Sequence, residues 1–260
     1  MALLTAGAAL LHATPALAAN RQVDMELVIA VDVSASMDRE EFLVQRSGYV
    51  EAIRHPDIVS AIEAGGLRRI ALTYVEWSAP WQKTVVPWQV IDGAESAEAF
   101  AAALEAQPLD IGRGTSISAA IGFGTVQLQS NGYDSGRSVI DISGDGPNNF
   151  GEPVTTARDE AVENGVIVNG LPILIAPSPT VPDVAAYYSD CVIGGPGSFV
   201  LPVKRIEEFA EAIRRKLIRE IAGTAESAIV PVSAAASVDC LAGEKMRELY
   251  ADPYYPGLDN

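Results

Sequence analysis

Three short segments of the sequence carry oxygen-bearing side chains at spacings that suit a hard metal ion. The first is Asp32-Val33-Ser34-Ala35-Ser36, in which one carboxylate and two hydroxyls occupy every second position. A loop that curls after such a run turns its oxygens toward one point, and Mg²⁺ prefers about six oxygen ligands in octahedral geometry. On its own the motif is weak, because Asp and Ser also satisfy the backbone of ordinary strand-to-helix turns.

Two further segments supply the remaining candidate ligands. Thr115 follows the loop Gly112-Arg113-Gly114, and Asp145 lies between Gly144 and Gly146. Each has an ordinary explanation, since Thr is a common helix N-cap and Asp beside Gly is a common turn residue. We expect the three segments to act together because each lies beside the end of an expected strand or the start of an expected helix. The predicted metal ligands are Asp32, Ser34, Ser36, Thr115 and Asp145.

These candidates need strands that end together, and the chain alternates the patterns of strands and helices. Strands are expected at 23–33, 67–77, 83–91, 138–143, 166–175 and 198–203. Helices are expected at 38–54, in a short piece ending at 65–66, and at 96–106, 115–130, 155–164 and 206–221. Alternation of this kind indicates a mainly parallel sheet with helices on both faces, whose ligand sites lie at the carboxyl ends of the strands. The turn 78–80 is too short for a crossover, so its two flanking strands form a hairpin.

Taken together, these segments make the chain resemble a von Willebrand factor A-type (VWA) domain with a metal-ion-dependent adhesion site, over roughly residues 23–223. The resemblance implies a doubly wound α/β fold with a mainly parallel six-stranded sheet in the order 3-2-1-4-5-6 and an antiparallel third strand. It also implies three metal loops, formed by Asp32, Ser34 and Ser36, by Thr115, and by Asp145. More narrowly, residues 141–149 and the closing helix resemble a bacterial group of exported VWA-like proteins of unassigned function.

The resemblance further implies a binding function. A bound cation, Mg²⁺ first and Mn²⁺ or Ca²⁺ as alternatives, would capture a carboxylate presented by a protein partner. Candidates for the layer around the ligands are Asp110, Asp141 and Asn148. Trp77 and Trp81 flank the hairpin turn beside the expected site, where they either contact the partner or simply cover the sheet edge.

The competing hypothesis is a metal-dependent hydrolase that uses the same acidic edge. An enzyme of this kind needs a recognisable catalytic constellation. The sequence contains no G-x-S-x-G, H-E-x-x-H, P-loop or G-x-G-x-x-G motif. We therefore favour a binding module without enzymatic activity, although fold alone does not decide between these functions.

Charge and composition exclude several classes of partner. The chain has 260 residues, a formal net charge of −16 and a sequence pI near 4.4. Nucleic-acid backbones and anionic membrane surfaces both attract clustered Lys and Arg, so neither is an expected partner. No apolar run has the length of a membrane span, and we expect no stable membrane insertion.

The first 19 residues are expected to form a signal peptide. An apolar stretch, Ala2 to Leu11, is followed by the small-residue tripeptide Ala16-Leu17-Ala18, although no Lys or Arg precedes the stretch. The alternative is a buried N-terminal helix, which fits less well because the apolar residues form no helical face. We therefore expect a periplasmic or secreted protein with a VWA-like domain at 20–223 and a tail at 224–260 that packs on it.

Two cysteines, Cys191 and Cys240, are expected to form a disulfide that ties this tail to the domain. The alternative is a pair of buried free thiols. A cysteine-bound zinc ion would need more soft ligands than the chain contains. His55 is the single imidazole after the expected signal peptide, and we expect it to cap the C-terminal end of a helix.

Overall fold

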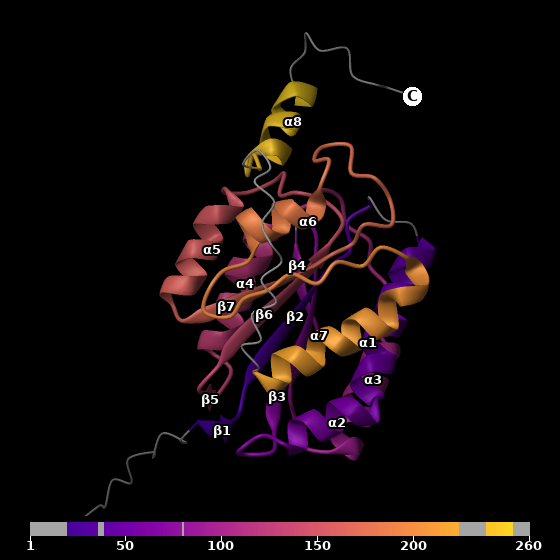
Figure 1. Cartoon of the computed structure of the whole chain (residues 1–260), viewed down its shortest axis with the longest axis vertical. Coiled ribbons are helices and arrows are strands. Elements are labelled where there is room, and N and C mark those ends of the chain that lie inside the picture. The colour runs from indigo at the N-terminus through magenta and orange to yellow at the C-terminus, as the bar shows by residue number, and fades with distance from the viewer. Residues whose placement is uncertain (1–19, 36–38, 80, 224–237, 252–260) are drawn as a thin grey trace, which may run out of the picture.

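The structure is a computed structural model in which residues 20–35, 39–79, 81–223 and 238–251 are described. Within them, one central sheet lies between two layers of helices (Figure 1). The expected signal peptide, the candidate ligand Ser36 and parts of the expected tail (224–237 and 252–260) lie outside the described residues. No helix in the described ranges has the length and apolarity needed to cross a membrane.

The central sheet has five strands in the order β4-β3-β2-β6-β7. Their bounds are β2 (Glu26–Asp32), β3 (Ile70–Trp77), β4 (Gln82–Ile91), β6 (Ser138–Gly144) and β7 (Val166–Pro172). β2 pairs in parallel with β3 and β6, β6 pairs in parallel with β7, and β4 is antiparallel to β3. The predicted hairpin and the mainly parallel α/β architecture are therefore confirmed.

The prediction of six strands is wrong, because residues 198–203 do not form a regular strand. They lie parallel beside β7 and are held by separate bridges. Leu201 N donates to Gly170 O at 3.0 Å, and further along Val203 N donates to Pro172 O at 2.9 Å. Between these bonds a regular ladder needs an N–H at position 172, which proline lacks. The sixth position of the sheet is occupied, but its ladder is interrupted there.

The predicted strand 23–33 is shorter in the structure, where β2 begins at Glu26 and Val23 ends a separate strand, β1 (Arg21–Val23). β1 pairs with β5 (Tyr133–Ser135) in a small separate sheet. The chain bends at Asp24, whose carboxylate accepts hydrogen bonds from the backbone N–H groups of Leu67 and Arg69. These bonds replace sheet pairing just before β3, which explains why β3 begins at Ile70 and not at Leu67 as expected.

Helices cover both faces of the sheet, as expected. One face is covered by α1 (Arg39–Arg54), α2 (Pro56–Glu63), α3 (Ala94–Glu105) and α7 (Phe209–Ala222), which follows the short turn η2 (Ile206–Glu208). The other face is covered by α4 (Ile117–Gln129), α5 (Val154–Glu163), α6 (Val184–Tyr187) and η1 (Tyr188–Val192). Successive residues of β2 point to opposite faces, so Leu27 and Ile29 enter the first core and Val28 and Ala30 the second.

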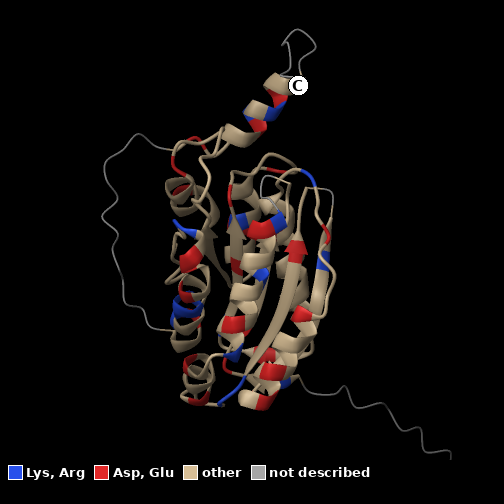
Figure 2. Ribbon diagram, turned by 90° about the vertical axis from the view of Figure 1, so that its right-hand side faces the viewer, with Lys and Arg blue, Asp and Glu red and all other residues tan. Residues whose placement is uncertain are grey.

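The sequence patterns do not predict α6, η1 or the C-terminal helix α8 (Ala242–Ala251). α8 lies beyond the carboxyl ends of the strands, at the top of Figures 1 and 2. The expectation for His55 is wrong as well. This residue caps the N-terminus of α2, where its Nδ1 accepts a hydrogen bond from Asp57 N at 3.2 Å.

Candidate metal centre

Asp32 is the last residue of the central strand β2, and its side chain is completely buried. Its Oδ1 accepts a hydrogen bond from Ser34 N at 2.7 Å, which curls the chain as soon as the strand ends. Its Oδ2 is buried and makes no hydrogen bond within the described part of the chain. Burial, followed by the charge of Asp145, raises the pKa of Asp32 well above its usual range. A buried carboxylate in this setting gains most from a cation placed against it.

Asp145 directly follows β6, the parallel neighbour of β2, so the two strand ends lie side by side. Gly144 permits their close approach. A Cβ at this position would lie 2.9 Å from Asp32 Oδ2 and 2.7 Å from the hydroxyl of Tyr188. Any other residue would therefore push the third predicted metal loop away from the first.

Thr115 is held by hydrogen bonds from the loop that follows β6. Its N–H donates to Asn149 Oδ1 at 2.9 Å, and its carbonyl accepts from Asn149 N at 2.9 Å and Phe150 N at 3.2 Å. Thr115 is 5% exposed. The helix N-cap here is Ser116, because α4 begins at Ile117 and Ser116 Oγ accepts from the first turn. Capping therefore does not account for Thr115, and its position is explained by the loop contacts.

Ser34 is buried and forms a parallel bridge with Gly112. Gly112 has no room for a side chain, because a Cβ there would lie 2.0 Å from Ser78 Oγ. Gly114 adopts φ +71°, a conformation that favours glycine, and its carbonyl accepts a hydrogen bond from Ala79 N at 2.8 Å. The glycine loop is thus packed between the first predicted metal loop and the hairpin turn.

The structure brings four of the five candidate ligands to one edge of the sheet; Ser36 lies outside the described residues. The four are Asp32, Ser34, Thr115 and Asp145. In the described ranges, no three or more His, Cys, Asp or Glu side chains gather as a metal site. The candidate set instead combines two carboxylates with neutral hydroxyls, a group of hard oxygen donors suited to Mg²⁺, Mn²⁺ or Ca²⁺.

The three residues predicted around the ligands lie in different places. Asn148 is completely buried beside the Thr115 loop, where its Oδ1 accepts from Ser118 N at 3.0 Å. Asp141 points to the face of the sheet that α7 covers, where Lys216 Nζ lies 2.5 Å from its Oδ1. Asp110 is exposed and pairs with Lys83 at 2.6 Å. Asp141 and Asp110 thus have ion-pair partners of their own, away from the predicted ligands.

The two tryptophans beside the hairpin turn also differ in their burial. Trp77 is completely buried in the second core, so the structure excludes it from contact with a partner. Trp81 is partly buried and contributes to a surface depression of about 490 Å³. The depression is lined by Trp81, Gln82, Lys83, Leu109, Asp110 and Ile111. It borders the glycine loop, because a Cβ at Gly112 would lie 3.4 Å from Trp81 Cζ2.

Tyr188 also lies at the site, although no motif in the sequence predicts it. It is completely buried, and its hydroxyl makes no hydrogen bond within the described ranges. Burial and then the charge of Asp32 raise the pKa of Tyr188 well above its usual range, so the phenol is neutral. Tyr188 belongs to η1, which has no motif in the sequence. No pattern among the neighbouring residues predicts that this segment packs against the site.

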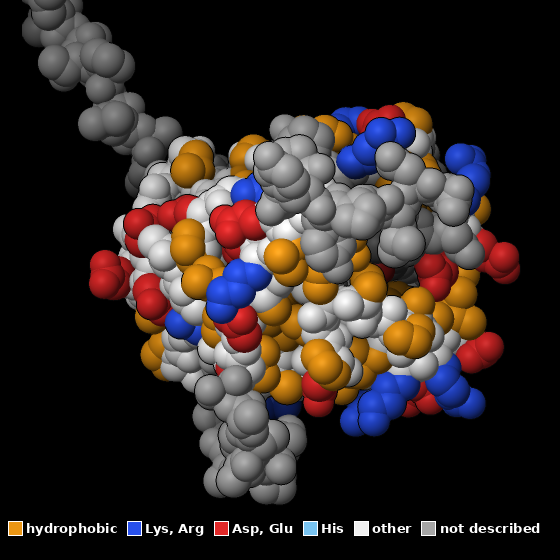
Figure 3. Space-filling model, turned by 90° about the horizontal axis from the view of Figure 1, so that it is seen from above, with side chains coloured by type: hydrophobic (Ala, Val, Ile, Leu, Met, Phe, Trp, Pro, Cys, Tyr) orange, Lys and Arg blue, Asp and Glu red, His pale blue; other side chains and the backbone are white. Residues whose placement is uncertain are grey.

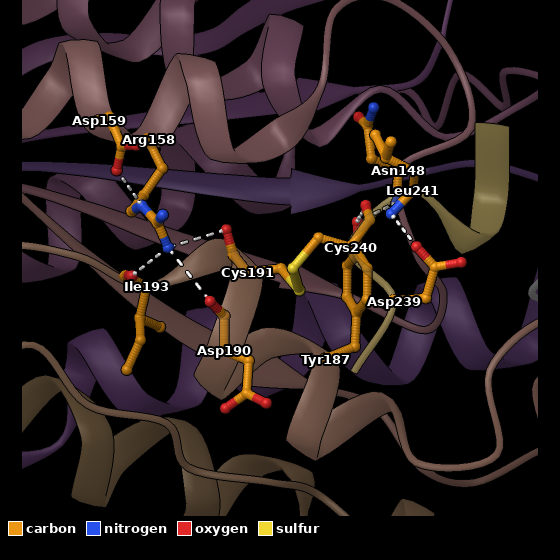
Figure 4. Close-up of a disulfide and its surroundings, with 10 residues drawn as sticks. All are labelled: Asn148, Arg158, Asp159, Tyr187, Asp190, Cys191, Ile193, Asp239, Cys240 and Leu241. Atoms are coloured by element: carbon orange, nitrogen blue, oxygen red, sulfur yellow. Dashed lines mark hydrogen bonds and ion pairs between the residues drawn. A yellow bond between two sulfur atoms is a disulfide. The ribbon is translucent and has the colours of Figure 1, made fainter. Parts of the chain in front are cut away.

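Cys191 and Cys240 form the predicted disulfide, with their Cα atoms 5.5 Å apart (Figure 4). The bond joins η1 to the segment that leads into α8.

Seen from above, the face around the carboxyl ends of the strands shows hydrophobic side chains among charged groups of both signs (Figure 3). Ile111, Phe150 and Leu241 are exposed hydrophobic residues in the loops of this region.

Several solved structures share the fold of this chain. Proximal thread matrix protein 1 from the mussel byssus aligns with a TM-score of 0.59 at 15% identity, over 79% of this chain and 49% of that chain. A further structure of that protein, with a TM-score of 0.56, is described as having a zinc-occupied MIDAS motif. The pilus adhesin SpaC from Lactobacillus rhamnosus GG aligns with a TM-score of 0.55 at 14% identity, over 78% of this chain and 31% of that chain.

A von Willebrand factor type A protein from Catenulispora acidiphila aligns with a TM-score of 0.55 at 15% identity, over 76% of this chain and 43% of that chain. The chain thus spans half or less of the length of these proteins, and the likeness shows the fold alone. Comparison with curated proteins finds no match. Residues 22–225 match the family described as "Protein of unknown function (DUF1194)". The chain therefore has a VWA-like fold and belongs to this DUF1194 family.

Proposed function

We propose that this protein is a divalent-cation-dependent binding module that captures an acidic group of a protein partner. The residues that would hold the cation are Asp32, Ser34, Ser36, Thr115 and Asp145. Mg²⁺ suits this set best, with Mn²⁺ and Ca²⁺ as alternatives. When bound, the cation supplies the positive charge that attracts a carboxylate of the partner.

The observation that carries the proposal is the buried carboxylate of Asp32. Its Oδ2 has no hydrogen-bond partner among the described residues, and the charge that affects its pKa is a second carboxylate, Asp145. Burying an ionised carboxylate without compensation costs several kcal/mol, about 3 or more. A cation between the two carboxylates would remove this cost. The likeness in fold to the mussel protein with a zinc-occupied MIDAS motif supports the same interpretation.

Binding is favoured over the alternative, a metal-dependent hydrolase, by the position of His55. This imidazole lies at the junction of α1 and α2, where its Nε2 lies 2.8 Å from Arg214 Nη1. α2 is at the end of the molecule opposite to α8 and the strand ends (Figure 1). The described residues therefore bring no imidazole to the candidate site, and its hydroxyls and carboxylates serve as ligands in our proposal.

Calorimetric titration of the mature protein with Mg²⁺, Mn²⁺ and Ca²⁺ tests the cation site. We expect binding in the wild type and none in the double variant Asp32→Ala/Asp145→Ala, which keeps only neutral ligands. Asp134→Ala is the matched control, because Asp134 is an exposed carboxylate on β5, which lies at the opposite end of the molecule from the candidate ligands (Figure 1). Unchanged binding in the double variant would remove the site assignment.

Capture of a partner is tested separately, by affinity purification with and without chelator. The depression beside the glycine loop suggests that the partner also places an apolar group against Trp81. We expect Trp81→Ala and Ser34→Ala each to weaken capture while leaving the melting temperature almost unchanged. Capture that persists in chelator would contradict a cation-held carboxylate.

We also propose that the protein is exported, to the periplasm or the medium. The support is the Cys191–Cys240 disulfide, because such bonds persist in oxidising compartments. N-terminal sequencing of the mature protein is expected to find a start near Ala19 or Asn20. An uncleaved chain recovered from the cytoplasm would contradict the proposal.

A further inference from the structure

The disulfide fixes the C-terminal segment of the described chain at the start of α8. Cys191 is completely buried in η1, and its partner Cys240 lies two residues before the helix. Asp239 stabilises the turn that leads from Cys240 into α8, because its Oδ1 accepts a hydrogen bond from Leu241 N at 3.1 Å (Figure 4). The beginning of α8 is therefore held against the domain by a covalent bond.

From this anchor, α8 contacts the loop that follows β6 at three neighbouring points. Asn148 Nδ2 donates a hydrogen bond to Glu244 Oε1 at 2.7 Å. The guanidinium of Arg247 lies 4.6 Å from the centre of the Phe150 ring, within the range of a cation–π contact. Gly243 packs so closely that a Cβ there would lie 2.0 Å from Asn148 O.

The same loop holds Thr115 and the start of α4 on its other side. Asn149 exchanges hydrogen bonds with Thr115 through both its side chain and its backbone. Phe150 O accepts from Ser116 Oγ at 3.0 Å, and Asn148 Oδ1 accepts from Ser118 N at 3.0 Å. One short loop thus lies between α8 and the second predicted metal loop, with polar contacts to both.

We propose that α8 is a clamp that positions Thr115 for the cation, with Gly243, Glu244 and Arg247 as positioning residues. The metal part of this proposal rests on the proposed function; the ordering of the loop does not. A threonine hydroxyl is a weak neutral ligand, and Mg²⁺ requires nearly ideal geometry. The supporting contacts around a ligand therefore affect metal affinity strongly, by about 10- to 100-fold in known sites.

Gly243→Ala tests the clamp, because it should stabilise α8 as a helix and at the same time weaken its contact with the loop after β6. Alanine favours a helix more than glycine does, so the substitution stabilises α8 itself. Its Cβ would also meet the backbone carbonyl of Asn148 and move α8 away from the loop. We expect amide exchange of residues 115–118 and 148–150 in metal-free protein to rise by about tenfold. We expect Mg²⁺ affinity to fall by about tenfold.

Glu244→Ala removes the hydrogen bond to Asn148 and should give the same pattern with a smaller loss of affinity. Glu244→Gln keeps an acceptor oxygen, so it should restore both loop protection and affinity. Glu248→Ala is the matched control, because Glu248 lies one turn further along α8 and is exposed. It should behave as the wild type in both measurements.

The two readouts separate the clamp from the proposed function. Unchanged amide exchange in Gly243→Ala and Glu244→Ala would overturn the clamp, whether or not the protein binds a cation. Faster exchange with unchanged Mg²⁺ affinity would overturn the positioning of Thr115. No Mg²⁺ binding by the wild type would overturn the proposed function, and with it the metal part of the clamp.

Discussion

Two regions of this protein bury acidic side chains, and they differ in the source of the compensating charge. On the α7 face of the sheet, Asp141 and Glu220 each have an oxygen 2.5 Å from Lys216 Nζ. At the carboxyl edge, Asp32 is equally buried, and the charge that affects its pKa is another carboxylate, Asp145. The first region contains its own cation, whereas the second gains most from one that is supplied from solution.

Other groups also contact the cluster around Lys216, and Asp141 Oδ2 and Glu220 Oε2 are buried without a hydrogen-bond partner among the described residues. Asn169 Nδ2 donates to Glu220 Oε1 at 2.9 Å, and Lys216 Nζ lies 5.2 Å from the centre of the Phe199 ring. Burial and then the charge of Glu220 raise the pKa of Asp141 to about 7, while Lys216 opposes this rise. The Lys216 cluster therefore joins α7 to the sheet through an internal cation, whereas a cation at the edge is part of our proposal.

The largest expected effect follows from removing the internal cation. Lys216→Met leaves Asp141 and Glu220 buried without compensation, and we expect the free energy of unfolding to fall by about 3–5 kcal/mol at pH 7.5. Urea denaturation measures this change. Lys204→Met, at an exposed position, is the control and should change stability by less than about 0.5 kcal/mol.

Adding Asp141→Asn and Glu220→Gln to Lys216→Met should recover most of the loss, because the buried charges are then gone. If Lys216→Met is as stable as the wild type, Lys216 does not compensate the charges of Asp141 and Glu220. The proposed difference between this cluster and the carboxyl edge would then be wrong.

The second effect concerns the carboxyl edge, where removing the charge of Asp32 should not destabilise the metal-free protein. Asp32→Asn keeps the acceptor for Ser34 N and removes a buried charge, so in chelator we expect no loss of stability. With Mg²⁺ at 100 times its dissociation constant, the wild type should gain about 2.7 kcal/mol and the variant nothing. Thermal unfolding with and without Mg²⁺ measures both values. A large loss in chelator would show that Asp32 is compensated internally, like Asp141.

A third effect is the pH dependence of the Lys216 cluster. The pKa of Asp141 is about 7 in the folded protein, above its ordinary value of 3.8, so the folded state retains a proton that the unfolded state has lost. This contribution to stability is complete below about pH 4 and is lost as the pH rises through 7. The slope for one proton is at most about 1.4 kcal/mol per pH unit.

Urea denaturation from pH 5 to pH 8 should therefore show the wild type losing stability relative to Asp141→Asn. The variant has no group to titrate at this position, and the ionisable groups outside the Lys216 cluster act as a common background. Parallel pH profiles of the two proteins would contradict the raised pKa of Asp141.

The smallest expected effect concerns Asp110, which pairs with Lys83 on the surface. Exposed ion pairs contribute little, so Asp110→Asn should change the free energy of unfolding by less than about 0.5 kcal/mol. Its Mg²⁺ affinity in calorimetry should equal that of the wild type. A clear fall in affinity would place Asp110 in the electrostatic surroundings of the cation and sharpen the boundary of the edge site.

Much of the fold follows from local features of the sequence. The apolar run before Asp32 predicts a buried central strand, and the short turn 78–80 predicts the hairpin of β3 and β4. Gly112, Thr115 and Asp145 were assigned to strand ends and helix starts from their neighbours alone. These features could be predicted because periodicity and turn length depend on residues close together in the chain.

Other features depend on contacts between distant parts of the chain. Pro172 interrupts a ladder whose other side is 26 or more residues away in the sequence, and Asp141 meets a lysine that is 75 residues away. Tyr188 and the contacts of α8 with Asn148 have no local pattern that predicts them.

The sequence by itself therefore determined the order of the five central strands and the main helices between them, the three oxygen-bearing segments and the pair of cysteines, since each depends on neighbouring residues. The tertiary structure alone decided which carboxylates have an internal cation, which tryptophan is buried, and how α8 meets the loop beside Thr115. The physical reason is that burial and charge compensation are set by all the groups around a side chain. Most of those groups come from other strands and helices.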